Sequence, residues 1–272
     1  MTGRGVPAAP RAAAALGPVV GRFATASGPP VAPRPWRRSP GLAAGGSTEL
    51  PWPRGAVKRI GHKGAHSLAP GNTLASFEAA LHAGVDVIEF DVINKCGRLV
   101  LAHSVLDAYR RPCLLLKDGL AHLADERYAP LQFNVDLKRP GGERAVVDLV
   151  REFGLTERCL VSSQFVSSLD RVRAIEPRIA VGVSVGGFLA RRLHRWDGRR
   201  LAELVAGQIR AGRFDALMAH HTLVCDRLVE LVIAAGGDVY AWTVDDPRAV
   251  ARLVAAGVAG VTTNDPRVFI GV

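Results

Sequence analysis

The sequence predicts an α/β protein built as a TIM-type (β/α)8 barrel that follows a disordered N-terminal tail. From about residue 58 onward, short β-rich runs alternate with helical segments, and about eight such units can be counted. The helical segments repeatedly end in small residues and glycine. Glycine is the usual residue just past a helix because it tolerates the left-handed backbone conformation. Eight βα units favour a barrel, with a doubly wound sheet as the alternative.

The expected elements follow one another at regular intervals. Strands are expected at residues 59–62, 87–92, 99–103, 133–138, 159–163, 180–185, 216–219, 239–244 and 260–263. Helical segments that end in glycine precede five of them, at 77–84, 145–154, 201–212, 228–237 and 249–257. The strand at 99–103 is expected to pair with the one at 87–92 through a turn at 95–98. Because aromatic residues make up only 6% of the chain, the core must consist mainly of Ala, Val and Leu.

Residues 1–54 are predicted to be a disordered, basic tail rich in Ala, Pro and Arg, and residues 55–272 to form the barrel. The tail lacks any apolar periodicity. The net charge is +10, but residues 1–59 carry nine cations and one acid, so the rest of the chain is nearly neutral. Nucleic-acid binding would need a clustered basic face on the barrel, so no nucleic-acid partner is expected. The tail leaves peripheral contact with an anionic membrane open.

Cysteine spacing and hydropathy indicate the compartment. The four cysteines lack zinc-ligand or redox spacing and are expected to be free, buried thiols in a reducing compartment, at Cys96, Cys113, Cys159 and Cys225. No apolar stretch reaches 18 residues, so no transmembrane helix is expected. These features favour a cytoplasmic protein. The small residues at 24–26 and the lack of acids before Glu49 leave export or organelle import open, and the oligomeric state is not indicated.

Acidic residues gather on the expected strands, where a TIM barrel carries its chemistry. Glu89 and Asp91 lie two residues apart on one strand, so both carboxylates face the same side. Asp136 lies near the end of the strand expected at 133–138. Carboxylate oxygens are hard ligands that suit Mg²⁺ or Ca²⁺. Buried acids without a cation would repel one another, so these three residues are candidate ligands of a divalent metal.

Imidazoles and ammonium groups accompany these acids. His62 ends the first expected strand and His103 ends the third, so they are candidates for a general acid and a general base near neutral pH. Lys63 and Lys138 are candidates for binding phosphate oxygens. The residues do not indicate which histidine is the acid and which the base.

Several segments, in the same order along the chain, resemble the glycerophosphodiester phosphodiesterase family. The motif His62-Lys63-Gly64 resembles the family's His-Arg-Gly, and the strand around Glu89 resembles its Glu-x-Asp-Val. The segment that ends at His103 resembles the part of the family that carries a second catalytic histidine. The resemblance spans about residues 58–270 and rests on segments 61–64, 70–74, 88–92, 97–103, 136–138, 242–244 and 260–266.

The resemblance implies hydrolysis of glycerophosphodiesters or lysophospholipid-like substrates to an alcohol and glycerol phosphate. It implies that Glu89 and Asp91 bind the metal, with Asp136 in the place of a family glutamate. The two histidines would activate the substrate's own glycerol hydroxyl and protonate the leaving alcohol, giving a cyclic phosphate that water then opens. Trp242, in the closing strands, is expected to contact the substrate.

Departures from the family pattern leave a second hypothesis open. Lys63 stands in place of Arg, Gly71 in place of Glu, and Ser104 in place of Asp. Only 32 residues separate His103 from Asp136, which is shorter than the usual capping insertion. The alternative to an enzyme is therefore a non-catalytic barrel that binds a phosphorylated ligand.

Overall fold

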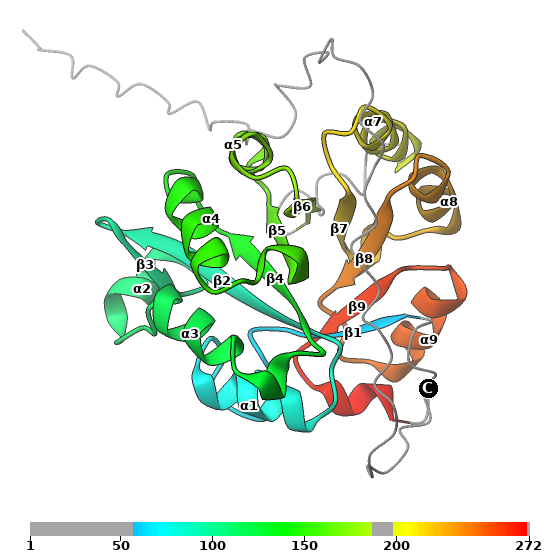
Figure 1. Cartoon of the computed structure of the whole chain (residues 1–272). Helices are drawn as coiled ribbons and strands as arrows, with labels where there is room; N and C mark the ends of the chain where they lie inside the picture. The colour runs from blue at the N-terminus through cyan, green and yellow to red at the C-terminus, as the bar shows by residue number, and fades with distance from the viewer. Residues whose placement is uncertain (1–56, 187–197, 271–272) are drawn as a thin grey trace, which may run out of the picture.

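The computed structural model describes residues 57–186 and 198–270, which form a closed barrel of parallel strands with helices around it (Figure 1). The strand order is β1-β9-β8-β7-β6-β5-β4-β2-β3, and an additional pairing of β1 with β2 closes the ring. Ile60 of β1 pairs with Val87 on one side and with Thr262 on the other. The predicted TIM-type barrel is confirmed, and closure rules out the open, doubly wound sheet.

The elements alternate along the chain as the sequence predicts. The barrel strands are β1 (Lys58–Gly61), β2 (Val87–Lys95), β4 (Gln132–Leu137), β5 (Cys159–Ser163), β6 (Ala180–Val185), β7 (Ala216–His220), β8 (Asp238–Trp242) and β9 (Gly260–Thr263). The helices are α1 (Leu74–His82), α2 (Val105–Arg110), α3 (Leu116–Leu123), α4 (Glu143–Glu152), α5 (Val166–Ile175), α7 (Gly198–Arg210), α8 (Asp226–Ala234) and α9 (Pro247–Ala255).

A hairpin extends the second strand beyond the barrel (Figure 1). β3 (Arg98–Leu101) pairs antiparallel with the far half of β2. Cys96 and Gly97, with φ of 50° and 84°, form the two-residue turn between them. Positive φ at both positions matches the twist of the flanking strands, so the turn fixes the register. The predicted pairing is confirmed, although the strand ends at Leu101 and His103 lies just beyond it.

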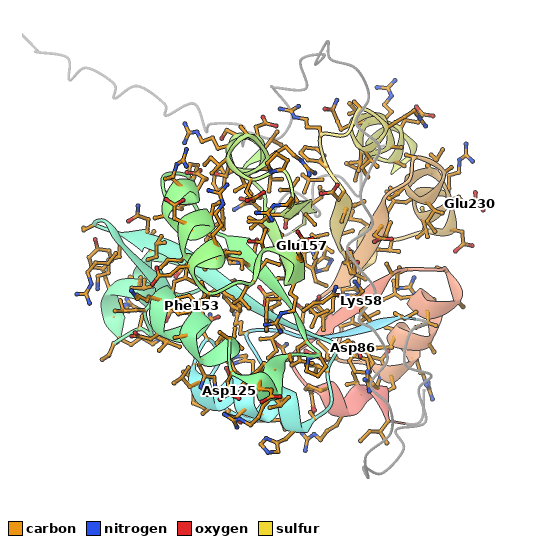
Figure 2. All side chains as sticks on the ribbon, in the orientation of Figure 1. Lys58, Asp86, Asp125, Phe153, Glu157 and Glu230 are labelled. Atoms are coloured by element: carbon orange, nitrogen blue, oxygen red, sulfur yellow. The ribbon has the colours of Figure 1, made fainter. Side chains whose placement is uncertain are left out.

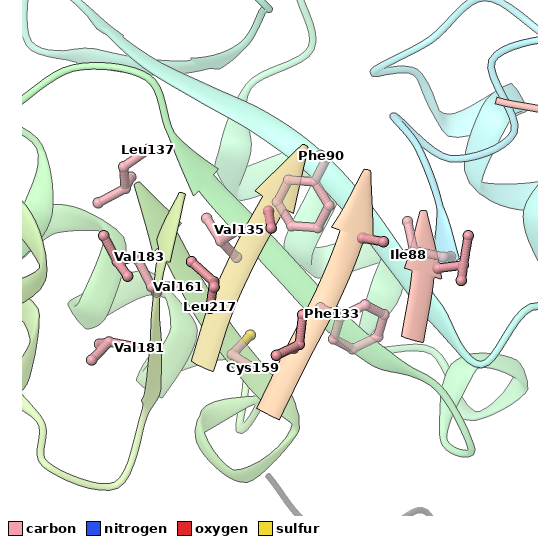
Figure 3. Packing of buried hydrophobic residues seen from close by; sticks show 14 of the residues in the cluster. Ile88, Phe90, Phe133, Val135, Leu137, Cys159, Val161, Val181, Val183 and Leu217 are labelled. Atoms are coloured by element: carbon pink, nitrogen blue, oxygen red, sulfur yellow. The ribbon is translucent and has the colours of Figure 1, made fainter. Parts of the chain in front are cut away.

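Alternate residues of each strand face two different cores. Residues facing outward form one large cluster with the apolar side chains of the helices, and Figure 3 labels Phe90, Phe133 and Val161 among its members. Residues facing inward form a smaller cluster in the barrel interior, around Ile60 and Tyr240. Because strands in a barrel are buried on both faces, a polar side chain on a strand needs a specific partner or ligand.

Ion pairs hold the amino-terminal ends of the strands. Figure 2 shows Lys58, Asp86 and Glu157 at this end, since each begins or precedes a strand. The buried guanidinium of Arg59 donates two hydrogen bonds to Asp86, at 2.9 and 3.0 Å, and the Arg59 backbone N–H donates a third. The groups singled out in the sequence lie instead at or near the carboxyl ends of the strands.

The cysteines are free, but the prediction that all four are buried is wrong. Only Cys159 is buried; Cys113 is partly exposed, and Cys96 and Cys225 are exposed. Cys96 sits at the hairpin turn and Cys225 at the N-cap of α8, both positions where the chain turns at the surface. In the part of the chain that the structure describes, no helix combines the length and apolarity needed to span a membrane. The predicted tail, 1–54, and its predicted membrane contact lie outside the described residues.

Candidate active site

Strand register brings the three predicted metal ligands together. Asp91 on β2 and Asp136 on β4 are direct partners in the parallel ladder, and Glu89 precedes Asp91 by two residues on the same face. One oxygen from each carboxylate lies within 4.8 Å of the others. Glu89 and Asp91 are buried, and Asp136 is partly exposed. Three hard oxygen donors therefore converge at one point near the carboxyl ends of the strands.

The electrostatics of this acid cluster fit a divalent cation. Burial raises the pKa of Glu89 well above its ordinary value, and the neighbouring Asp91 carboxylate raises it further. A carboxyl group with a raised pKa is one that lacks compensation for its negative charge. A hard cation bound by the three carboxylates would supply that compensation, so the residues present fit a divalent metal ion.

Lys138 provides part of the positive charge. Its ammonium lies 2.6 Å from Asp91 Oδ1 and also forms a short ion pair with Asp136. Burial lowers the pKa of Lys138, but the carboxylates of Asp136, Asp91 and Glu89 outweigh burial and raise it overall. For Asp91, burial acts to raise the pKa, while Lys138, His103 and Lys63 together bring it below the ordinary value.

His62 lies directly after β1 and beside the acid cluster. Its Nε2 is 3.9 Å from Glu89 Oε2, and its side chain is 18% exposed. Its Nδ1 lies 2.6 Å from Asn264 Oδ1. Burial first, and then the charge of Lys63, lower the pKa of His62 to about 4, although the hydrogen bond with Asn264 acts to raise it. The imidazole is therefore neutral at pH 7.

His103 contacts the cluster from the segment between β3 and α2. Its Nδ1 lies 3.2 Å from Asp91 Oδ2, and its side chain is 56% exposed. Its backbone N–H donates to Asp107 in the first turn of α2, and Ser104 caps this helix by accepting from the Asp107 N–H. Each histidine therefore contacts one of the buried acids, and His103 is the more exposed of the two.

The loop between β1 and α1 contacts two of the acids, Glu89 and Asp91. The Lys63 N–H donates to Glu89 Oε2 at 2.8 Å, and the Lys63 ammonium lies 3.9 Å from Asp91. Asn72, 1% exposed, donates from Nδ2 to Asp91 Oδ2 at 2.9 Å and accepts from the Asp91 N–H at 3.1 Å. Lys63 and Asn72 both have positive φ, of 54° and 61°, and Asn72 N–H donates to the Lys63 carbonyl. The left-handed backbone at these two positions therefore accompanies a Lys63 N–H that contacts Glu89 and an Asn72 side chain that contacts Asp91.

Two departures from the family pattern have a local explanation. A Cβ at position 71 would lie 2.7 Å from His66 Nδ1, so the His66 ring occupies the space that a side chain at position 71 would need. The Gly71 N–H instead donates to that nitrogen, at 3.2 Å. Ser104 supplies the N-cap oxygen of α2, a role that serine and aspartate fill equally well.

Asn72 and Asn264 contact the site, although the sequence alone did not single them out as site residues. Both residues belong to segments that resemble the family, 70–74 and 260–266, and this resemblance was the available signal. Trp242 differs from the other predicted residues. It lies at the carboxyl end of β8, where its ring packs edge-on against His220 with centroids 5.4 Å apart. The side chains that the structure joins in one cluster are His62, Lys63, Glu89, Asp91, His103, Asp136 and Lys138.

Comparison with known proteins gives matches over the same regions. Models of the glycerophosphoryl diester phosphodiesterase family match residues 62–109, which include both histidines, and residues 238–267. A glycerophosphodiester phosphodiesterase of Caldanaerobacter subterraneus is 27% identical over 246 residues, covering 78% of this chain and 95% of the relative. A plant relative, an enzyme of the same name from Arabidopsis thaliana, is 42% identical over 52 residues, which are 19% of this chain and 16% of the relative.

Solved structures share the fold. A glycerophosphodiester phosphodiesterase of Parabacteroides distasonis superposes with a TM-score of 0.64 at 20% identity, covering 79% of this chain and 95% of that one. An Oleispira antarctica phosphodiesterase, solved with its product sn-glycerol-3-phosphate, gives a TM-score of 0.59 at 22% identity and covers 80% and 94% of the two chains. These structures show the shared fold, while the family-model matches at both ends of the barrel and the curated relatives support assignment of the chain to the glycerophosphodiester phosphodiesterase family.

Proposed function

We propose that this protein is a divalent-metal-dependent phosphodiester hydrolase that converts glycerophosphodiesters to an alcohol and glycerol phosphate. The observation that carries the proposal is the convergence of three carboxylates within 4.8 Å, with His62 beside Glu89 and His103 beside Asp91. The family-model matches and the activity named for the curated relatives support the same proposal. Glu89, Asp91 and Asp136 would hold Mg²⁺ or Ca²⁺, which when bound neutralises phosphate charge and polarises phosphorus.

In this proposal His62 is the general base. Its neutral imidazole has Nδ1 hydrogen-bonded to Asn264, so Nε2 is free to accept a proton. It would take the proton of the substrate's glycerol hydroxyl as that oxygen attacks phosphorus. The bond from phosphorus to the leaving alcohol breaks, and a cyclic phosphate forms. Water then opens this ring with the proton transfers reversed.

His103 is the proposed general acid. Its Nδ1 faces the Asp91 carboxylate, so Nε2 is the nitrogen that exchanges a proton with the substrate. The leaving alcohol must depart toward solvent, and His103 is the more exposed of the two imidazoles, 56% against 18% for His62. A proton from His103 would prevent release of an alkoxide, which is a far poorer leaving group.

The lysines and Trp242 are proposed to bind the substrate. Lys63 and Lys138 both contact Asp91, so their ammonium groups lie where a phosphate bridging to the acid cluster would place its oxygens. Trp242 is proposed to contact the glycerol or alcohol part from the β8 rim. Exposed Leu106 and Tyr109 on α2, just after His103, would provide apolar contact for a lysophospholipid-like substrate.

A turnover assay with a matched variant tests this function. The full chain is incubated with a panel of soluble glycerophosphodiesters and with lysophospholipids, after removal of divalent metal and after addition of Mg²⁺ or Ca²⁺. Glu89→Gln is expected to abolish turnover, whereas Glu230→Gln, on the exposed face of α8, is expected to retain it. Binding of glycerol phosphate by the full chain, without turnover of any substrate under any metal condition, would favour the non-catalytic alternative.

A further inference from the structure

A chain of hydrogen bonds runs from the surface to His62. Asp245, just after β8, accepts a hydrogen bond from Asn264 Nδ2 at its Oδ2, over 2.6 Å. Asn264, just after β9, has its Oδ1 2.6 Å from His62 Nδ1. The three residues follow three different strands, and they lie next to one another because β9 pairs with both β8 and β1 in the closed barrel.

The orientation of the Asn264 amide is determined by its neighbours. The ionised carboxylate of Asp245 can only accept hydrogen bonds, so it must face the NH₂ group of Asn264. Its other oxygen, Oδ1, accepts from Thr263 Oγ1 and from the Asn264 backbone N–H, both at 2.8 Å. These bonds hold Asp245 in place. The amide oxygen of Asn264 therefore points at His62, and an oxygen acceptor there requires His62 Nδ1 to carry a hydrogen.

We propose that Asp245, acting through Asn264, is a positioning residue that selects the Nδ1–H tautomer of His62. This inference rests on the proposed function, in which Nε2 must be unprotonated to accept the hydroxyl proton. In the other tautomer Nε2 would carry the hydrogen and His62 could not act as a base. Neither Asp245 nor Asn264 needs to touch the substrate for this role.

The isosteric change Asp245→Asn tests the proposal because it reverses which groups donate and which accept along the hydrogen bonds from residue 245 to His62. The bonds from Thr263 and the Asn264 N–H require the new carbonyl oxygen at the position of Oδ1. The new NH₂ then faces the NH₂ of Asn264, which must turn over to present its oxygen. His62 Nδ1 now meets an NH₂ group and has to accept, so the hydrogen moves to Nε2. We expect kcat to fall by about 10²-fold or more, within the range lost with a general base, and KM to change by less than about threefold.

Nitrogen-15 NMR of the histidine rings reads the tautomer directly and needs no activity. The His62 signals are assigned by their loss in His62→Gln. In the wild-type full chain at neutral pH, the proton is expected on Nδ1; in Asp245→Asn, it is expected on Nε2. The control is Asp246→Asn, at the N-cap of α9, where asparagine caps as well as aspartate and neither tautomer nor kcat should change.

Exchanging the residues at positions 245 and 264 should restore the original donors and acceptors along the hydrogen bonds to His62. In the double variant Asp245→Asn with Asn264→Asp, the new carboxylate at position 264 accepts hydrogen bonds both from the new amide at position 245 and from His62 Nδ1. The Nδ1–H tautomer is expected to return, with kcat within about tenfold of wild type.

Two results would overturn the proposal: an Nε2–H tautomer in the wild type, or an unchanged tautomer in a folded Asp245→Asn protein. If the tautomer switches and reverts as expected while no variant, including wild type, hydrolyses any diester, then the positioning role stands and the proposed function fails. If the wild type hydrolyses diesters and the tautomer does not switch, then the positioning role fails alone.

Discussion

Replacement of Asn72 by alanine should destabilise the protein because this side chain joins the β1–α1 loop to the acid cluster. Asn72 donates one hydrogen bond to the Asp91 carboxylate and accepts one from the Asp91 N–H. A buried hydrogen bond to a charged group contributes about 1.5–3 kcal/mol and a neutral one about 0.5–1.5 kcal/mol. Alanine at φ 61° adds about 1–2 kcal/mol of backbone strain. Because Asp91 keeps its contacts with Lys138 and His103, we expect each contribution to lie at the lower end of its range. The free energy of unfolding should then fall by about 3 kcal/mol in all.

Asn72→Gly separates the two contributions. Glycine also removes both side-chain hydrogen bonds, but it adopts the left-handed conformation without strain. Its greater freedom in the unfolded chain offsets part of this advantage. The glycine variant should therefore be more stable than the alanine variant by about 1 kcal/mol, although still less stable than wild type.

Thermal and urea unfolding of wild type, Asn72→Ala and Asn72→Gly measure these differences. For a domain of this size, 1 kcal/mol corresponds to about 2–4 °C in Tm, so the alanine variant should melt about 6–12 °C lower. An alanine variant within about 1 kcal/mol of wild type would mean that the Asn72–Asp91 bonds do not support the site. Equal stabilities of the two variants would contradict the assignment of backbone strain at this position.

Three further predictions concern the acid cluster, the two histidines and Glu176 at the C-cap of α5. In Glu89→Gln, the rise in Tm that Mg²⁺ or Ca²⁺ gives the wild type should be lost. The metal-free variant should be at least as stable as metal-free wild type, because an uncompensated buried charge is gone. Calorimetry with and without the cation checks both results. His62→Ala and His103→Ala should each lower kcat by about 10²–10⁴-fold, and the double variant should lose less than the product; near-normal kcat in either would remove that residue from the proton transfers. Hydrogen bonds from Arg178, opposed in part by burial, lower the pKa of Glu176 to about 2, below its ordinary 4.5. Its contribution, about 1–2 kcal/mol, should be full above pH 5 and vanish as pH falls toward 2, so the stability gap between wild type and Glu176→Gln should close over that range in urea titrations.

The strands and the pairing of Glu89 with Asp91 could be predicted because both depend on local pattern. Alternation along a strand fixes which side chains share a face, and glycine after each helix marks where the next strand begins. The hairpin followed from a short turn between two apolar runs. The convergence of Asp136 on Asp91 also follows once the strands are parallel and adjacent, because the register makes these two residues direct partners.

The support of His62 could not be predicted in this way. Asn264 lies 202 residues from His62 and reaches it only because β9 pairs with β1 when the barrel closes. Local pattern carries no information on how the first and last strands meet. Asn72 was hidden for another reason: its left-handed backbone and its bonds to Asp91 depend on a loop whose path is set by tertiary contacts. The exposed positions of Cys96 and Cys225 have the same origin, since they follow from where the chain turns.

Stability and function make opposite demands on the acid cluster. Three carboxylates drawn together inside a barrel raise the free energy of the folded chain, as the raised pKa of Glu89, caused first by burial and then by Asp91, indicates. The fold nevertheless surrounds these acids with donors that orient them: the Lys63 N–H for Glu89, the Asn72 amide for Asp91 and Ser162 Oγ for Asp136. A merely structural cluster would gain more stability from apolar replacements than from such oriented donors. The combination of mutual repulsion and orienting hydrogen bonds is therefore best explained by a ligand that needs all three carboxylates.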